Sequence, residues 1–155
     1  MAGTADRASG AAVIVGSDGR AKAYRPLPEA QRHEAIAAGL AAYDRGDFFE
    51  AHEELEPAWM GSDDPAERAL LQGLIKVAAA YVHDVRGNPA GIDRNLTGAR
   101  RLLREALAGD QAENAAGVDL VALLADVEAR LADLAAHPGT STLEAPTIHR
   151  TTRLP

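Results

Sequence analysis

Residues 48–59 read Phe48-Phe49-Glu50-Ala51-His52-Glu53-Glu54-Leu55-Glu56-Pro57-Ala58-Trp59, and this stretch decides how the chain folds. Its apolar residues recur at the spacing of three and four that one face of a helix requires, so it predicts an amphipathic helix. Asp47, followed by Glu50 three residues later, is much like a capping box and predicts that the helix begins directly after Asp47.

A helical wheel separates the acidic residues of this stretch. At about 100° per residue, His52 and Glu56 fall between apolar residues, and Glu53 lies at the margin of the same arc. Glu50 and Glu54 point the other way, toward solvent. Burial of a charged group is costly unless it finds a partner. We therefore expect His52 and Glu56 to be buried and to form a polar site inside an apolar helical domain.

Four further helices are predicted around this one. The first begins near Pro28 and ends at Gly46, which is expected to adopt a left-handed cap. The remaining three follow the predicted helix in sequence, and each is bounded by cap residues, prolines or glycines. They are expected at about residues 65–86, 89–108 and 118–136.

The predicted fold class is all-α, an irregular antiparallel bundle of about five helices with non-helical N- and C-terminal tails. Short connections between helices favour antiparallel neighbours. We divide the chain into an extended arm at 1–27, a helical domain at 28–136 and a tail at 137–155. Within the arm, Val13-Ile14-Val15 could start a small hairpin, although an isolated hairpin is only marginally stable.

The third predicted helix is apolar over most of its circumference and is expected to be central. Its clear polar stripe is Gln72, Lys76 and His83. The simplest account pairs this stripe with His52 and Glu56. Alternatively the stripe faces water, and an arginine of the fourth helix serves as partner. Gly73 and Gly98 are expected to mark close contact between the third and fourth helices.

Composition limits the partners that we expect. The formal net charge is −7, which argues against a surface for nucleic acid or anionic membranes. The chain has no cysteine, so disulfides, thiolate metal sites and cysteine nucleophiles are excluded. No apolar run reaches the roughly 18 residues of a membrane span. We expect a cytoplasmic protein, and the excess of alanine and arginine is typical of a GC-rich bacterial genome.

Four sequence blocks carry a resemblance to a known family. They are the stretch from Phe48 to Glu56 with Trp59, then Gln72-Gly73-Leu74-Ile75, then Tyr81-Val82-His83 with Gly87-Asn88, then Gly98-Ala99-Arg100-Arg101-Leu102-Leu103. Over about residues 30–107 the chain resembles the domain of unknown function 309 family. The resemblance implies a compact helical bundle and no established activity. It also implies that the residues central to the family pattern are His52, Glu53, Glu56, Trp59, Gln72 and Gly73.

Three classes of function compete for these residues. The first is a metal site, since His52 and Glu56 can reach one ion and His83 or Glu53 could complete the set. The second is metal-free acid–base catalysis by Glu56 or Glu53 with a histidine. The third is a binding groove around Trp59, Phe49 and Met60. Against all three stands a purely structural hydrogen-bond network of His52, Glu56 and Gln72.

Our prediction is a small helical binding domain with a polar site between the second and third helices. The residues of that site are His52, Glu53, Glu56, Trp59, Gln72 and His83. The alternative is a metal-dependent hydrolase that uses His52, Glu56 and His83. A divalent metal is thus a candidate cofactor but not the favoured one, and the partner is a small molecule or a protein that the sequence does not identify.

Overall fold

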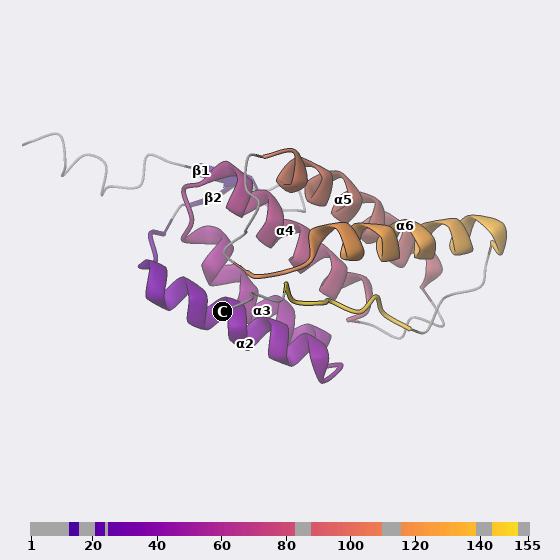
Figure 1. Cartoon of the computed structure of the whole chain (residues 1–155), viewed down its shortest axis with the longest axis horizontal. Helices are drawn as coiled ribbons and strands as arrows, with labels where there is room; N and C mark the ends of the chain where they lie inside the picture. The colour runs from indigo at the N-terminus through magenta and orange to yellow at the C-terminus, as the bar shows by residue number, and fades with distance from the viewer. Residues whose placement is uncertain are drawn as a thin grey trace, which may run out of the picture.

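The fold is a bundle of helices, which confirms the predicted all-α class (Figure 1). The computed structural model describes residues 13–15, 21–23, 25–82, 88–109, 116–138 and 144–151. Five helices lie within these residues: α2 (Glu29–Asp44), α3 (Phe48–Met60), α4 (Pro65–Ala80), α5 (Pro89–Ala108) and α6 (Leu120–Ala136). Each helix packs chiefly against its neighbours in sequence, which gives the antiparallel order expected from short connections.

Side-chain caps fix the starts of the helices. The Asp47 carboxylate accepts a hydrogen bond from the Glu50 amide, and the Asp64 carboxylate accepts one from the Ala66 amide. Asn88 and Asp119 cap α5 and α6 in the same way. Such caps satisfy amides that have no partner within the helix. The predicted helix starts near Asp47, Asp64 and Asn88 are therefore confirmed.

Two predicted helix boundaries are wrong. The third predicted helix was expected to reach about Arg86, but α4 ends at Ala80 and Tyr81 is its C-cap. The Tyr81 ring packs on Phe48 at a centroid distance of 5.8 Å, so a tertiary contact accompanies the end of the helix. The fifth predicted helix was expected to include Val118. Val118 instead forms a bridge with Arg150, and α6 begins at Leu120.

The core lies around α4, which contributes more buried residues than any of the other four helices. Its buried residues are Ala69, Leu70, Leu71, Gly73, Leu74, Ile75, Val77, Ala78 and Ala80. A Cβ at Gly73 would lie 2.9 Å from Leu103, and a Cβ at Gly98 would lie 2.9 Å from the Lys76 side chain. Both glycines therefore mark the crossing of α4 and α5, as predicted.

The described part of the N-terminal arm contains a short hairpin. Strand β1 (Val13–Val15) pairs antiparallel with β2 (Ala21–Ala23), with Val13 opposite Ala23 and Val15 opposite Ala21. This pairing agrees with the small hairpin that the sequence allowed, and the division of the chain at residue 27 stays a prediction. The segment Arg25–Leu27 then lies against the end of α3 through backbone hydrogen bonds from Arg25 to Met60 and from Leu27 to Gly61.

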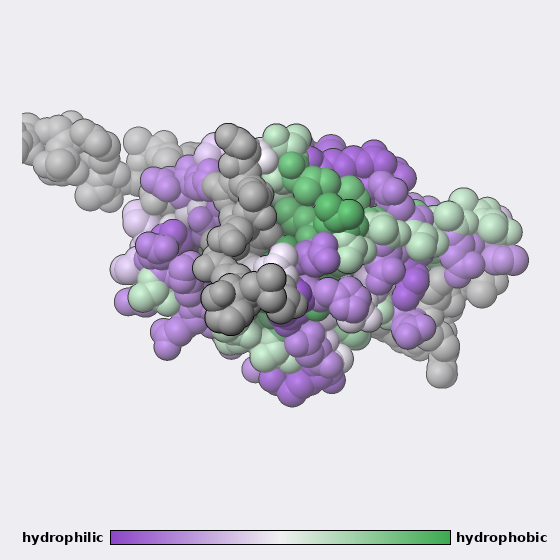
Figure 2. Space-filling view, in the orientation of Figure 1, coloured by the Kyte–Doolittle hydropathy of each residue, from purple (hydrophilic) through white to green (hydrophobic). Residues whose placement is uncertain are grey.

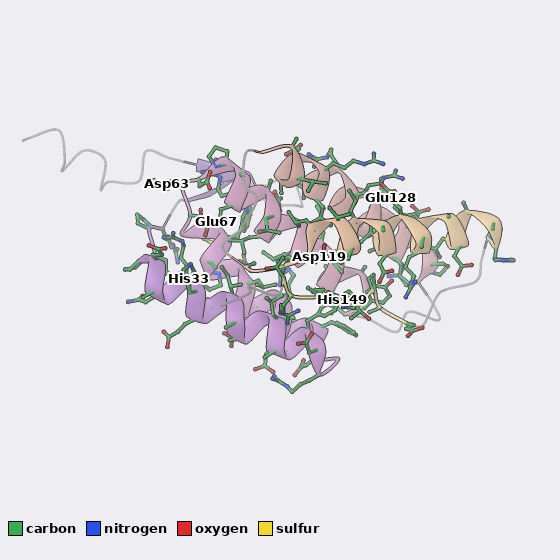
Figure 3. All side chains as sticks on the ribbon, viewed as in Figure 1. His33, Asp63, Glu67, Asp119, Glu128 and His149 are labelled. Carbon is green, nitrogen blue, oxygen red and sulfur yellow. The ribbon has the colours of Figure 1, made fainter. Side chains whose placement is uncertain are left out.

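The C-terminal segment 144–151 has no helix, as predicted, yet it packs on the bundle. Ile148 is buried, and the buried Tyr43 hydroxyl donates a hydrogen bond of 2.6 Å to the Pro146 carbonyl. The Asp119 amide donates to the His149 carbonyl at 2.8 Å, and Figure 3 labels both residues where the segment passes the start of α6. This segment is therefore part of the packed structure and not a loose tail.

Most of the visible surface in Figure 2 is hydrophilic, with a hydrophobic patch where the end of α5 meets the start of α6. Leu107 and Val121, on these two helices, are among the exposed large apolar side chains. Among the helices of the described residues, none is both long and apolar enough to cross a membrane.

Candidate functional site

Helix α3 places one apolar face against the bundle and a polar flank beside it. Gly46, in the left-handed conformation at φ 79°, ends the preceding turn, and the cap of Asp47 then starts the helix. The buried face consists of Ala51, Leu55, Ala58 and Trp59. Leu55 packs where Gly39 of α2 offers no side chain. The flank beside this face carries His52 and Glu56.

The predicted burial of the two inner polar residues is wrong in degree. The His52 side chain is 30% exposed, and Glu56 is half-buried. Glu50 is exposed as expected, but Glu54 is half-buried and not exposed. Phe49 explains the error, because its residue surface is 62% exposed. We had counted Phe49 in the apolar arc, and without it the buried arc ends near Trp59, so His52 and Glu56 lie at its edge.

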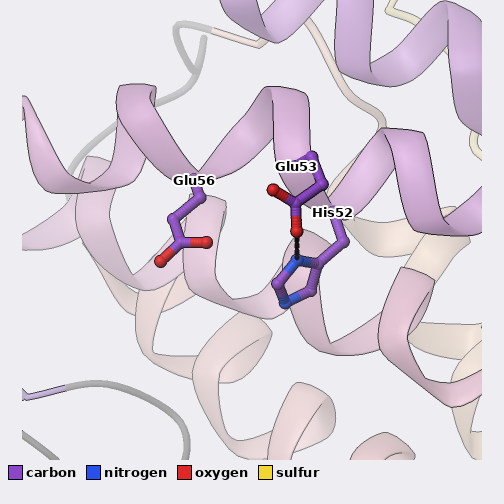
Figure 4. Close-up of side chains that lie close together, drawn as sticks. All are labelled: His52, Glu53 and Glu56. Carbon is purple, nitrogen blue, oxygen red and sulfur yellow. Dashed lines mark ion pairs between the residues drawn. The ribbon is translucent and has the colours of Figure 1, made fainter.

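His52, Glu53 and Glu56 form a compact cluster on this edge (Figure 4). The Nδ1 atom of His52 lies 3.6 Å from the Oε1 atom of Glu53, and the Glu53 side chain is 56% exposed. One ligand atom from each of the three residues lies within 4.8 Å of the other two. The cluster therefore brings one imidazole and two carboxylates together, with water able to reach them.

A cavity of about 350 Å³ lies beside the cluster, between the end of α3 and the segment Arg25–Leu27. The residues that line it are Arg25, Pro26, Leu27, Glu53, Glu56, Pro57 and Met60. Four of these side chains are apolar, and the two carboxylates belong to the cluster. The volume of the cavity is at the lower end of the range for small-molecule sites.

Gly61 makes this cavity wall possible. A Cβ at Gly61 would lie 2.4 Å from the Cβ of Leu27 and 3.0 Å from its backbone nitrogen. Only a residue without a side chain lets the Arg25–Leu27 segment approach the end of α3 so closely. This wall was not predicted from the sequence, because residues 1–27 were expected to form an extended arm. The feature of the sequence that pointed to this wall is Gly61, directly after Met60. In the structure its φ is −93°, so it is not a left-handed helix cap, and its small size is what the close approach requires.

The remaining predicted site residues lie on α3, on α4 or outside the described residues. Trp59 is buried in the core, and Gln72 on α4 is half-buried. Lys76, one turn after Gln72, lies against Gly98 of α5. His83 lies outside the described residues, so a site shared between α3 and the Gln72–His83 stripe stays a prediction.

Fold and cluster together define a class: a small antiparallel bundle of helices whose second helix carries an imidazole and two carboxylates on one flank. Residues 36–102 match the model of a protein family described as a domain of unknown function, DUF309. This confirms the resemblance, and His52, Glu53, Glu56, Trp59 and Gln72 all lie inside the match. No curated protein and no solved structure matches the chain significantly.

Proposed function

We propose that this protein is a binding domain whose site is the cavity between α3 and the Arg25–Leu27 segment. The observation that carries the proposal is that an apolar cavity and the cluster share Glu53 and Glu56. This site differs from the one that we predicted, because its second wall is the N-terminal segment and not α4.

The walls of the cavity indicate the chemistry of the ligand. Pro26, Leu27, Pro57 and Met60 favour an apolar body, as in most small-molecule sites. Glu53 and Glu56 supply two negative charges against one positive charge from Arg25, and the whole chain carries a net charge of −7. Charge complementarity then favours a cation. The proposed ligand is a small molecule with an apolar body and an amine.

Calorimetric titration with benzylamine and with its neutral counterpart, benzyl alcohol, tests the proposal. We expect benzylamine to bind more tightly, and Glu53→Gln or Glu56→Gln to weaken its binding about two- to fivefold each, since pairs with partly exposed carboxylates are weak. Glu50→Gln is the matched control, because Glu50 is exposed and bonds to Arg45. Equal affinity for amine and alcohol, or equal losses in all three variants, would contradict the proposal.

The cluster favours one alternative, a metal-dependent hydrolase in which His52 and Glu56 hold the metal. His83, the third residue of that prediction, is outside the described residues, and Glu53 is near enough to take its place. The test is hydrolysis of p-nitrophenyl acetate and p-nitrophenyl phosphate with added Zn²⁺ or Mn²⁺. Activity that requires Glu56 would support the hydrolase, and no metal-dependent turnover would exclude it for these substrates.

A further inference from the structure

We propose that a hollow on the outer face of α5 binds a phosphate group, either free or carried on a small organic molecule. The hollow has a volume of about 500 Å³. Its lining residues all belong to α5 and are Thr97, Gly98, Arg100, Arg101, Arg104, Glu105 and Ala108. None of them lines the cavity at the end of α3, so this site is independent of the proposed function.

The charge of the hollow is opposite to that of the whole chain. Three arginines line it against one glutamate, whereas the chain carries a net charge of −7. The end of the Lys76 side chain adds a positive charge at the rim, because a Cβ at Gly98 would lie 3.1 Å from its Nζ atom. A concave surface lined by one sign of charge concentrates ligands of the other sign. The ligand expected here is therefore an anion.

Arg100 is the arginine whose surroundings indicate a ligand most directly. It is half-buried, and it forms no hydrogen bond or ion pair with any residue that the structure describes. A charged group that is partly removed from water and has no partner loses solvation without compensation. The five N–H donors of its guanidinium group are therefore available to an anion that enters the hollow.

Arg101 and Arg104 keep donors available, although each already holds one carboxylate. Nη1 of Arg101 donates to Glu105 at 3.1 Å, and Nη2 of Arg104 donates to Glu128 of α6 at 2.7 Å; Figure 3 labels Glu128 beside α5. Each bond uses one of the three guanidinium nitrogens, so both side chains can also donate to a ligand. Arginine pairs with phosphate through two parallel hydrogen bonds. Three such groups match the double negative charge of phosphate better than the single charge of a carboxylate.

The helix dipole does not account for this group of arginines. Cations are favoured at the C-terminus of a helix, but the effect is confined to the last turn. Helix α5 ends at Ala108 and has no basic residue in its last turn. Arg100 and Arg104 are instead four residues apart, a spacing at which like charges destabilise a helix. A bound anion would relieve this repulsion.

Calorimetric titration of the full chain in a phosphate-free buffer tests the proposal, with phenyl phosphate, inorganic phosphate and benzoate as probes. We expect phenyl phosphate to bind saturably and more tightly than benzoate, which carries a single charge. Arg100→Gln should lower the affinity for phenyl phosphate about five- to tenfold, the loss expected for one charge-assisted bidentate contact. Arg94→Gln is the matched control, because Arg94 is exposed on the same helix but does not line the hollow. It should change the affinity by less than about twofold, since salt screens exposed charges at that separation.

Glu105→Gln provides a result that a loss of folding cannot mimic. It removes the negative charge inside the hollow and releases Arg101, so phenyl phosphate should bind about two- to fivefold more tightly. Tighter binding of phenyl phosphate than of inorganic phosphate would assign the site to an organic phosphate, and the reverse order would assign it to the free ion. The proposal would be overturned by the absence of saturable binding of both phosphate probes, by benzoate binding as tightly as phenyl phosphate, by equal losses in Arg94→Gln and Arg100→Gln, or by no gain in Glu105→Gln.

Discussion

At the scale of single residues, Gly61 determines the shape of the proposed site. Its missing side chain lets Leu27 close one wall of the cavity. The Arg25 and Leu27 amides then bond to the end of α3. The cavity therefore depends on one glycine that contributes no functional group of its own.

Gly61→Ala should destabilise the chain and open the cavity. The new Cβ would meet the backbone of Leu27, which cannot move aside as a flexible side chain can. We expect a loss of about 1–3 kcal/mol in the free energy of unfolding, as for other overpacked sites, and weaker binding of benzylamine. Urea denaturation measures the first and calorimetry the second. An alanine variant with unchanged stability would contradict the packing argument.

Tyr43→Phe should cost about 1–2 kcal/mol at neutral pH, because the buried Pro146 carbonyl would lose its hydrogen bond. Burial, and secondly the charge of Tyr81, raise the pKa of Tyr43 well above the ordinary value of 10.0. The unfolded chain releases this proton near pH 10 and the folded chain does not, so stability falls as the pH rises through that value. The slope of stability against pH above 10 should be shallower in the variant. Denaturation at several pH values measures both effects. An unchanged slope in the variant would show that Tyr43 does not cause the loss of stability above pH 10.

The sequence predicted which residues gather at the site better than it predicted their burial. His52, Glu53 and Glu56 could be grouped because helical spacing is regular. The exposure of these three side chains could not be predicted, because it depends on whether Phe49 points into the core or toward solvent. Phe49 is a strongly apolar residue that nonetheless lies at the surface, and a helical wheel cannot identify such an exception. The Arg25–Leu27 wall depends on a contact between segments about 35 residues apart, which no local pattern contains.

At the scale of helices, Gly73 and Gly98 look alike in the sequence but have different neighbours where α4 crosses α5. Both lie inside helices, where glycine costs about 1 kcal/mol relative to alanine. Gly73 faces Leu103, which is fully buried, whereas Gly98 faces the end of the Lys76 side chain. A rigid neighbour and a flexible one should respond differently to a new methyl group.

Gly73→Ala should therefore destabilise the chain, by about 1–2 kcal/mol after the gain in helix propensity is subtracted. Gly98→Ala should be neutral or stabilising by up to about 1 kcal/mol, since Lys76 can move aside. Parallel urea denaturation of both variants measures the difference. If Gly98→Ala were the more damaging of the two, the described crossing would be incorrect.

Helices were the most predictable elements, because their caps are local. Asp47, Asp64 and Asn88 stand at the observed starts, and Gly46 at an observed end. The errors lie where tertiary contacts decide a boundary. Tyr81 packs on Phe48 where α4 ends, and Val118 pairs with Arg150 before α6 begins. Neither partner is close in sequence, so neither boundary could be derived from composition or spacing.

At the scale of the whole molecule, residues 144–151 extend the packed structure beyond the stretch that matches the family. They connect α2 to the start of α6 through Tyr43, Asp44 and Asp119. Their buried apolar side chains distinguish a docked segment from one held only by charges. Ile148 is 4% exposed, and Arg150 pairs with Asp44 at the surface.

Ile148→Ala should lower the free energy of unfolding by about 2–4 kcal/mol, as for other large apolar residues truncated in a core. Arg150→Ala should cost less than about 1 kcal/mol, because the Arg150–Asp44 pair is partly exposed. Chemical denaturation of the two variants compares them. A larger loss for Arg150→Ala would show that surface charges, and not burial, hold the segment.

The central claim is that the chain binds its ligand at the flank of α3 that faces the Arg25–Leu27 segment. Amide NMR spectra of the full chain during titration with benzylamine test this claim most directly, because they locate the contact residue by residue. We expect saturable shifts confined to the amides of Arg25 and Leu27 and of residues 53–60 of α3, with Pro57 silent because it has no amide proton. Saturable shifts located elsewhere on the bundle, or no saturable shifts at all, would contradict the claim.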